Sequence, residues 1–175
     1  MKKLSNLAAV ALIGAALLFA SKVKAQTTPA NAVRLGIGVD AGIPTGRASN
    51  SSNLELGGTA RLQYGLSNNF ALTLTSGYYD LIGKQNPNNN RYYKGYQIVP
   101  VKIGVKEFFA KDLYVGAEAG VGFVTTVGGH SKLDLSPTLG WANNHWDVGV
   151  HYDNFSGQGF SYGLLGLRLA YGFGL

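Results

Sequence analysis

Cysteine is absent from the chain, and charged residues are scarce. Without cysteine there is no disulfide and no lipoprotein anchor after a leader. Charged residues make up 14% of the sequence, against about 25% in soluble domains. The longest apolar run, Leu7 to Ala20, has about 14 residues, whereas a membrane-spanning helix needs about 20. These absences exclude a disulfide scaffold and are unusual for a soluble domain.

Residues 1–25 have the pattern of a secretory signal peptide. Lys2 and Lys3 precede the apolar run, and Val23-Lys24-Ala25 puts small residues where a signal peptidase reads. We therefore expect cleavage before Gln26 and one mature domain over 26–175.

Most of the net positive charge lies in this leader. Its four lysines reduce the 15 basic residues to 11, against 9 acidic ones, so the mature chain carries +2. The charge therefore gives no support for nucleic-acid binding, and we expect no nucleic-acid partner.

After the leader, apolar residues alternate with polar residues or glycine. In the stretch from Val101 to Lys106, for example, every second residue is aliphatic. Period two is typical of β-strands that have one apolar face. Most of the segments have the length that a tilted strand needs to cross a bilayer, about 9–11 residues. Eight segments follow the pattern: Val33–Ile43, Leu54–Leu66, Phe70–Leu81, Gln97–Phe109, Leu113–Phe123, Leu133–Trp141, Trp146–Asp153 and Ser161–Phe173.

Long and short links alternate between these segments. The long links are PTGRASNSSN, IGKQNPNNNRYYKGY, VTTVGGHSK and NFSGQGF, and the short ones are SNN, AKD and ANNH. Outer-membrane barrels have long extracellular loops and short periplasmic turns. The sequence therefore predicts an all-β fold, an eight-stranded antiparallel up-and-down transmembrane β-barrel. Both termini and the short links would lie in the periplasm.

The two faces of each strand predict where lipid and charge lie. The aliphatic faces would contact lipid, because a Lys or Arg near the bilayer midplane costs about 2–4 kcal/mol. The opposite faces would form a polar, packed interior in which charges pair. Basic residues expected inside are Arg34, Arg61, Lys102, Lys106 and Arg168, and acidic ones are Asp40, Glu55, Glu118, Asp134, Asp147 and Asp153. The expected interior charge network comprises Arg61, Lys102, Lys106, Glu55, Glu118, Asp134, Asp147 and Arg168.

Aromatic residues gather near the predicted strand ends. Trp141 and Trp146 flank a short link, and Tyr78 lies near the second long link, as do Tyr92, Tyr93 and Tyr96. Barrels carry aromatic girdles at both membrane interfaces. We expect Trp141, Trp146 and Tyr78 to form such girdles, the alternative being ordinary aromatic residues at strand ends.

Two stretches stand out besides the leader: VPVKIGVKEFFAKDLYVGAEAGVGF and the ending YGLLGLRLAYGFGL. Together with the leader, they resemble small Gram-negative outer-membrane barrels of the porin-family or OmpA/OmpX-like type. The resemblance is architectural and covers nearly all of the predicted mature chain. It implies residence in outer-membrane lipid and insertion by the barrel-assembly machinery, although Leu175 stands where such endings usually have Phe. It implies no single activity.

The near balance of inward charges favours a structural or surface-interaction barrel with a plugged interior, because eight strands leave room only for side chains. An extracellular ligand would then bind the external loops, above all Ile82–Tyr96, unless that loop is simply a solvated linker. The alternative is a small porin, in which inward glycines leave a path for water. These glycines are Gly36, Gly38, Gly104, Gly116, Gly120, Gly122, Gly149, Gly166 and Gly172.

Enzymatic motifs are weak, and we expect no enzyme and no cofactor. His151-Tyr152-Asp153-Asn154 faintly resembles the His-x-Ser-Asn motif of lipid A deacylases, but Asp153 stands where the nucleophilic Ser belongs and Ser156 is outside the strand pattern. His130, His145 and His151 do not have metal-ligand spacing.

Overall fold

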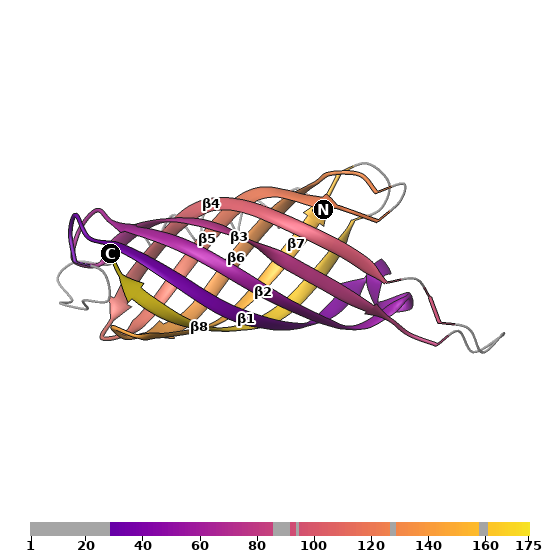
Figure 1. The fold of residues 1–175 in the computed structure, drawn as a ribbon, viewed down its shortest axis with the longest axis horizontal. Coiled ribbons are helices and arrows are strands. Elements are labelled where there is room, and N and C mark those ends of the chain that lie inside the picture. The colour runs from indigo at the N-terminus through magenta and orange to yellow at the C-terminus, as the bar shows by residue number, and fades with distance from the viewer. Residues whose placement is uncertain (1–28, 86–91, 94, 127–128, 158–160) are drawn as a thin grey trace, which may run out of the picture.

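A computed structural model describes residues 29–85, 92–93, 95–126, 129–157 and 161–175. These residues form a closed barrel of eight strands, each paired antiparallel with its sequence neighbours, and β1 pairs with β8 to close it (Figure 1). The predicted fold class is therefore confirmed. The predicted leader, residues 1–25, lies outside the described residues. Among the described residues, no helix is long and apolar enough to cross a membrane.

The strands extend beyond the predicted segments at several ends. Their bounds are β1 Val33–Gly46, β2 Ser52–Gly65, β3 Phe70–Gly83, β4 Tyr96–Ala110, β5 Leu113–Val124, β6 Lys132–Ala142, β7 Trp146–Ser156 and β8 Tyr162–Gly174. A short 3-10 helix, η1 (Arg47–Asn50), joins β1 to β2.

The barrel has two distinct ends. One, the turn end, holds the start of β1, the end of β8 and the links 66–69, 111–112 and 143–145. The other, the loop end, holds η1 and the links between β3 and β4, β5 and β6, and β7 and β8. Figure 1 shows the C-terminus at the turn end and the long β3–β4 hairpin projecting from the loop end.

The links alternate between longer and shorter ones as predicted, but the first link is shorter than expected. Pro44–Asn53 was expected to be a long loop, but β1 continues to Gly46 and β2 already begins at Ser52. The extra residues stay in the sheet because Thr45 and Gly46 pair with Gly163 and Tyr162 of β8. Gly46 has a φ of 65°, which favours glycine and lets the chain reverse tightly.

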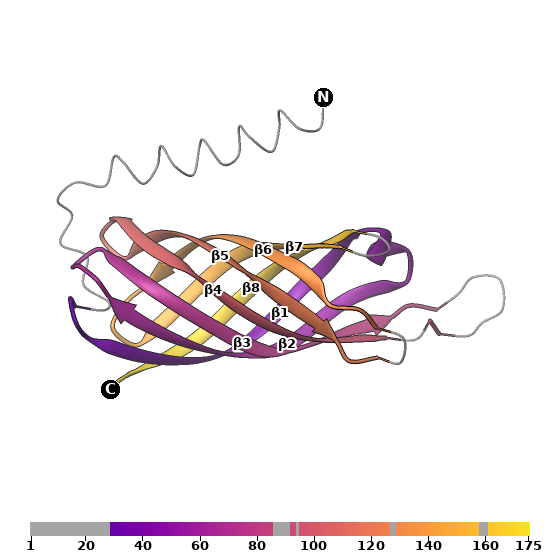
Figure 2. The same ribbon diagram turned by 90° about the horizontal axis from the view of Figure 1, so that it is seen from above.

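The β3–β4 hairpin extends farthest from the barrel (Figure 2). Beyond Gly83 an isolated bridge joins Gln85 to Tyr92, and the Tyr93 amide donates to the Lys84 carbonyl. The predicted loop Ile82–Tyr96 is therefore partly paired. Its residues 86–91 and 94 lie outside the described part of the chain.

Period two separates the two faces of the barrel wall as predicted. In β4, Ile103 is 64% exposed on the outside, whereas the neighbouring Lys102 is 2% exposed in the interior. The last strand keeps the same alternation, with Leu165, Leu167 and Leu169 outside and Arg168 inside. The exterior is thus an apolar belt and the interior holds the charges.

The interior is not polar throughout, which corrects the expectation. A buried apolar layer lies at the loop end, and a smaller apolar cluster lies at the turn end. The loop-end layer consists of Ala48, Tyr79, Leu81, Ile98, Phe155, Tyr162 and Leu164. The turn-end cluster consists of Phe108, Tyr114 and Ala142. The charged network lies between these two apolar regions.

Candidate functional site: the barrel interior

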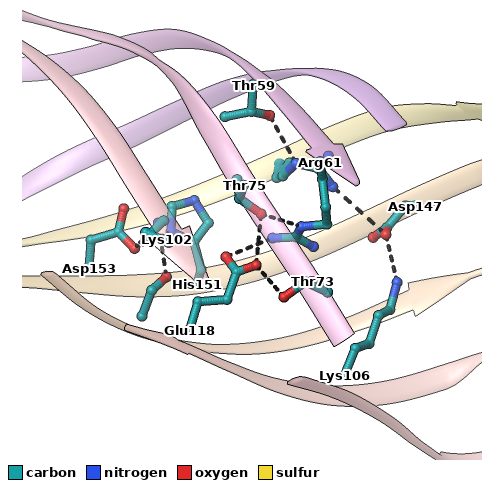
Figure 3. A network of polar contacts seen from close by, with 12 residues as sticks. Thr59, Arg61, Thr73, Thr75, Lys102, Lys106, Glu118, Asp147, His151 and Asp153 are labelled. Carbon is teal, nitrogen blue, oxygen red and sulfur yellow. Dashed lines mark hydrogen bonds and ion pairs between the residues drawn. The ribbon is translucent and has the colours of Figure 1, made fainter. Parts of the chain in front are cut away.

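Glu118 is the centre of one group of contacts inside the barrel. Its Oε2 lies 3.1 Å from Arg61 Nη2, and its Oε1 accepts hydrogen bonds of 2.7 Å from the hydroxyls of Thr73 and Thr75. Thr75 in turn accepts a 2.9 Å bond from Arg61 Nε. Strands β2, β3 and β5 each contribute to this group, so it ties together strands that are not all neighbours (Figure 3).

Asp147, at the start of β7, is shared by two cations and a tyrosine. Its Oδ2 lies 2.6 Å from Lys106 Nζ and 3.7 Å from Arg168 Nη1. Its Oδ1 accepts a 2.7 Å bond from the Tyr114 hydroxyl. Arg168 also donates from Nε to Thr59 at 2.9 Å. This group and the Glu118 group occupy the turn half of the interior.

A third group lies nearer the loop end. Lys102 Nζ lies 3.0 Å from Asp153 Oδ1 and 3.6 Å from Asp134 Oδ2. The two ring nitrogens of His151 lie 3.2 Å from Asp153 and 3.0 Å from Asp40. Three carboxylates surround Lys102 and His151 in this group, so acidic groups are in excess. In the turn half, basic groups are in excess.

The structure places every residue of the expected charge network in the interior. Arg61, Lys102, Lys106, Glu118, Asp134, Asp147 and Arg168 all take part in ion pairs. Glu55 is the exception, because it is fully buried and neither of its carboxylate oxygens has a hydrogen-bond partner among the described residues.

The sequence interpretation missed the hydroxyl groups of the network. Thr59, Thr73, Thr75, Ser136 and Tyr114 all bond to its charged members. The sequence did contain a signal for these residues, namely parity, the alternation of inward and outward side chains along a strand. Each hydroxyl residue alternates with outward residues, as Thr73 does between Leu72 and Leu74. Parity shows that a side chain points inward but does not name its partner.

The space beside most inward glycines is occupied by neighbouring residues. A Cβ on Gly140 or Gly149 would lie within 2.7 Å of the Tyr114 side chain, and one on Gly122 would lie 2.7 Å from the Phe155 ring. These glycines make room for aromatic rings, which supports interdigitation over a water path. Gly36 differs, because its nearest neighbour would be Arg168 Nη2 at 3.5 Å.

The aromatic residues expected in girdles all point outward. Trp141 and Trp146 are exposed at the turn end, and Tyr78 is exposed on β3. Trp146 packs edge-on against Tyr171, whose ring also packs against Phe173. The turn end therefore has a larger aromatic cluster than expected, while a role as membrane girdles stays a prediction.

The weak enzymatic motif does not form a nucleophile–base pair. Both His151 ring nitrogens contact carboxylates, and Asp153 is also held by Lys102. His130 and His145 lie in links at opposite ends of the barrel. Within the described ranges, no group of three His, Cys, Asp or Glu side chains could hold a metal ion.

Comparison with known proteins gives a match of fold alone. No family model matches the chain, and no curated protein matches its sequence. The solved structures that match include the crystal structure of Ail, the attachment invasion locus protein of Yersinia pestis. It is 11% identical over 82% of this chain and 99% of that one, with a TM-score of 0.57. The same protein in a phospholipid nanodisc gives 11% identity, the same coverage and a TM-score of 0.59.

A second protein gives the same result. The N-terminal β-barrel domain of Pseudomonas aeruginosa OprF is 14% identical over 83% of this chain and all of that domain, with a TM-score of 0.51. The chain therefore has the closed eight-stranded barrel fold of these outer-membrane proteins.

Proposed function

We propose that the chain is an integral outer-membrane β-barrel protein with a structural or surface-interaction role and an interior closed to solutes. Residues 1–25 act as a cleaved signal peptide, and residues 26–175 form the barrel. The barrel-assembly machinery inserts it, reading the alternation that ends at Leu175. The turn end faces the periplasm, and the loop end faces outward.

The observation that carries this proposal is the opposite sorting of side chains across the barrel wall. Large apolar residues are exposed on the outside of every strand, while all charged residues of the strands except Asp80 are buried, and most of them are paired inside. In water such a surface would be a large apolar patch, which soluble monomers rarely expose. In a bilayer it is the surface required, since closure leaves no strand edge unpaired.

The loop-end apolar layer supports a closed interior. Tyr79, Ile98, Phe155 and Leu164 are all almost fully buried there, from strands β3, β4, β7 and β8. A hydrated solute path would have to pass through this layer. The proposed function therefore depends on the external surface.

The β3–β4 hairpin is the element best placed for external contacts. It projects beyond the barrel (Figure 2), and its described residues include Tyr92, which is 73% exposed, and Tyr93. Exposed tyrosines provide contact area at low entropic cost. Among proteins of this fold, Ail is named the attachment invasion locus protein, and one crystal structure shows it with the heparin analogue sucrose octasulfate. These facts support a surface-interaction role for the loop end of this chain.

A small porin is the second candidate. Two small cavities in the turn half favour it, and Arg61 lines both. The apolar layer at the loop end opposes it.

Single cysteines test location and orientation, because the native chain has none. Asn50→Cys lies in η1 at the loop end, and Asn68→Cys lies at the turn end; both positions are exposed. We expect a membrane-impermeant maleimide to label Asn50→Cys on intact cells. Asn68→Cys should react only after the outer membrane is permeabilised. Labelling of Asn68→Cys alone on intact cells would contradict the proposed orientation, and equal labelling of both would contradict the outer-membrane location.

A further inference from the structure

Three arginines line one of the two cavities in the turn half of the interior. Arg34, Arg61 and Arg168 line it together with one acid, Asp147. Gln63 and residues of β1 and β8 complete the wall: Gly36, Ala170, Tyr171 and Gly172. A cavity with three guanidinium groups and one carboxylate has an excess of positive charge.

The carboxylates nearby do not offset this charge. Glu118 is bonded to Arg61 and two threonines. Asp147 is bonded to Lys106 and Tyr114, and Arg168 Nη1 lies farther from it, at 3.7 Å. Four cations (Arg34, Arg61, Lys106 and Arg168) thus share two carboxylates.

The same arginines carry unused hydrogen-bond donors. Arg34 donates from Nη1 to the Asn143 carbonyl at 2.9 Å, but its Nη2 has no hydrogen-bond partner among the described residues. Neither Nη1 nor Nη2 of Arg168 has one within the same ranges. Both side chains are buried, each residue being 5% exposed. Buried charged donors without partners are costly, and an oxyanion is the acceptor that guanidinium groups bind best.

Gly36, which also lines the cavity, lies beside the Arg168 guanidinium. A Cβ on Gly36 would lie 3.5 Å from Arg168 Nη2, with its next contacts at 3.7 and 3.9 Å. These are ordinary van der Waals contacts, so a side-chain atom added at Gly36 fits beside the guanidinium without displacing its neighbours. The barrel wall around it separates the cavity from surrounding lipid, so a ligand must be small and free rather than a lipid headgroup.

We propose that this cavity binds one small oxyanion of phosphate size, held by Arg34 and Arg168 with Arg61 as the third cation. The anion enters from the turn end, because the cavity lies in the turn half and the apolar layer lies at the loop end.

Titration of the full chain with inorganic phosphate tests the site. The barrel is folded in maltoside micelles, which contain no phosphate, and ionic strength is held constant with chloride. The readout is the shift of arginine side-chain NMR signals. We expect saturable shifts of Arg34 and Arg168. Arg34→Gln should weaken binding roughly tenfold through the loss of charge-assisted bonds. The control Arg47→Gln, at an exposed arginine in η1, should change nothing.

A second variant supplies the anion from the chain itself. Gly36→Asp puts a carboxylate beside Arg168, so it should abolish phosphate binding and raise the midpoint of urea unfolding. Gly36→Asn has nearly the same size without charge, and it should not raise the midpoint. The proposal is overturned by absent or non-saturable binding to the native barrel, or by phosphate binding that persists unchanged in Gly36→Asp.

Discussion

Reversal of one buried charge, Glu118→Lys, is expected to lower the free energy of unfolding by about 3–5 kcal/mol, the range measured when one partner of a buried ion pair is removed. The new ammonium would lie beside Arg61, and the hydroxyls of Thr73 and Thr75 would lose their shared acceptor. Urea unfolding in phospholipid vesicles measures the loss, with fluorescence of the two tryptophans as the signal.

The matched control for this prediction is Glu118→Gln. The amide keeps an oxygen that can accept from Arg61 or the threonines and adds no second positive charge, so the loss should be clearly smaller than that of Glu118→Lys. The porin alternative predicts a different pattern. Unchanged stability of Glu118→Lys, with a shift of ion selectivity, would contradict an interior held together by ion pairs.

A lysine on the outer face is expected to destabilise the barrel according to its depth. Ile103 lies at the middle of β4 and is 64% exposed on the outside. Ile103→Lys should cost about 2–4 kcal/mol in vesicles, the value for a Lys at the bilayer midplane. The reason is the transfer of an ammonium group into hydrocarbon.

Leu113→Lys is the control for depth. Leu113 is also exposed outside, but it begins β5 at the turn end. A Lys there lies near the interface, so the cost should be about 0–1 kcal/mol. Equal costs at the two positions, or no cost at Ile103, would show that the outer face does not contact the interior of a bilayer.

The alternation of residues was enough to predict the barrel wall. Period two assigns a side to each residue without knowledge of its partner, so Ile103 and Lys102 were placed correctly on opposite faces. Strand number followed because the segments were separated by turn-forming residues. Both features are local, and local features can be read from one sequence.

The contacts across the interior could not be read in this way. His151 contacts Asp40, which is 111 residues away, and Lys102 contacts Asp153, 51 residues away. Such pairs depend on the tilt and stagger of strands around a closed barrel, which no single segment specifies. Parity therefore placed Glu55 in the network, whereas the structure leaves its carboxylate without a hydrogen bond among the described residues.

The apolar layer at the loop end was missed for another reason. There both faces of a strand are apolar or aromatic, as in Tyr78-Tyr79 and Leu164-Leu165, so alternation no longer distinguishes inside from outside. The first link was misjudged because its Gly, Ser and Asn residues are typical of loops. Pairing of β1 with β8 as far as Gly46 overrides that composition.

Single-channel conductance tests the closed interior most directly. The full chain is inserted into a planar bilayer, with folding verified by the heat-dependent mobility of the barrel in gels. A variant with Tyr79, Ile98 and Phe155 changed to Ala, which opens the loop-end layer, serves as the positive control. We expect no current steps from the native barrel and measurable steps from this variant. Stable, ion-selective steps from the native barrel would contradict the closed interior and identify the chain as a porin.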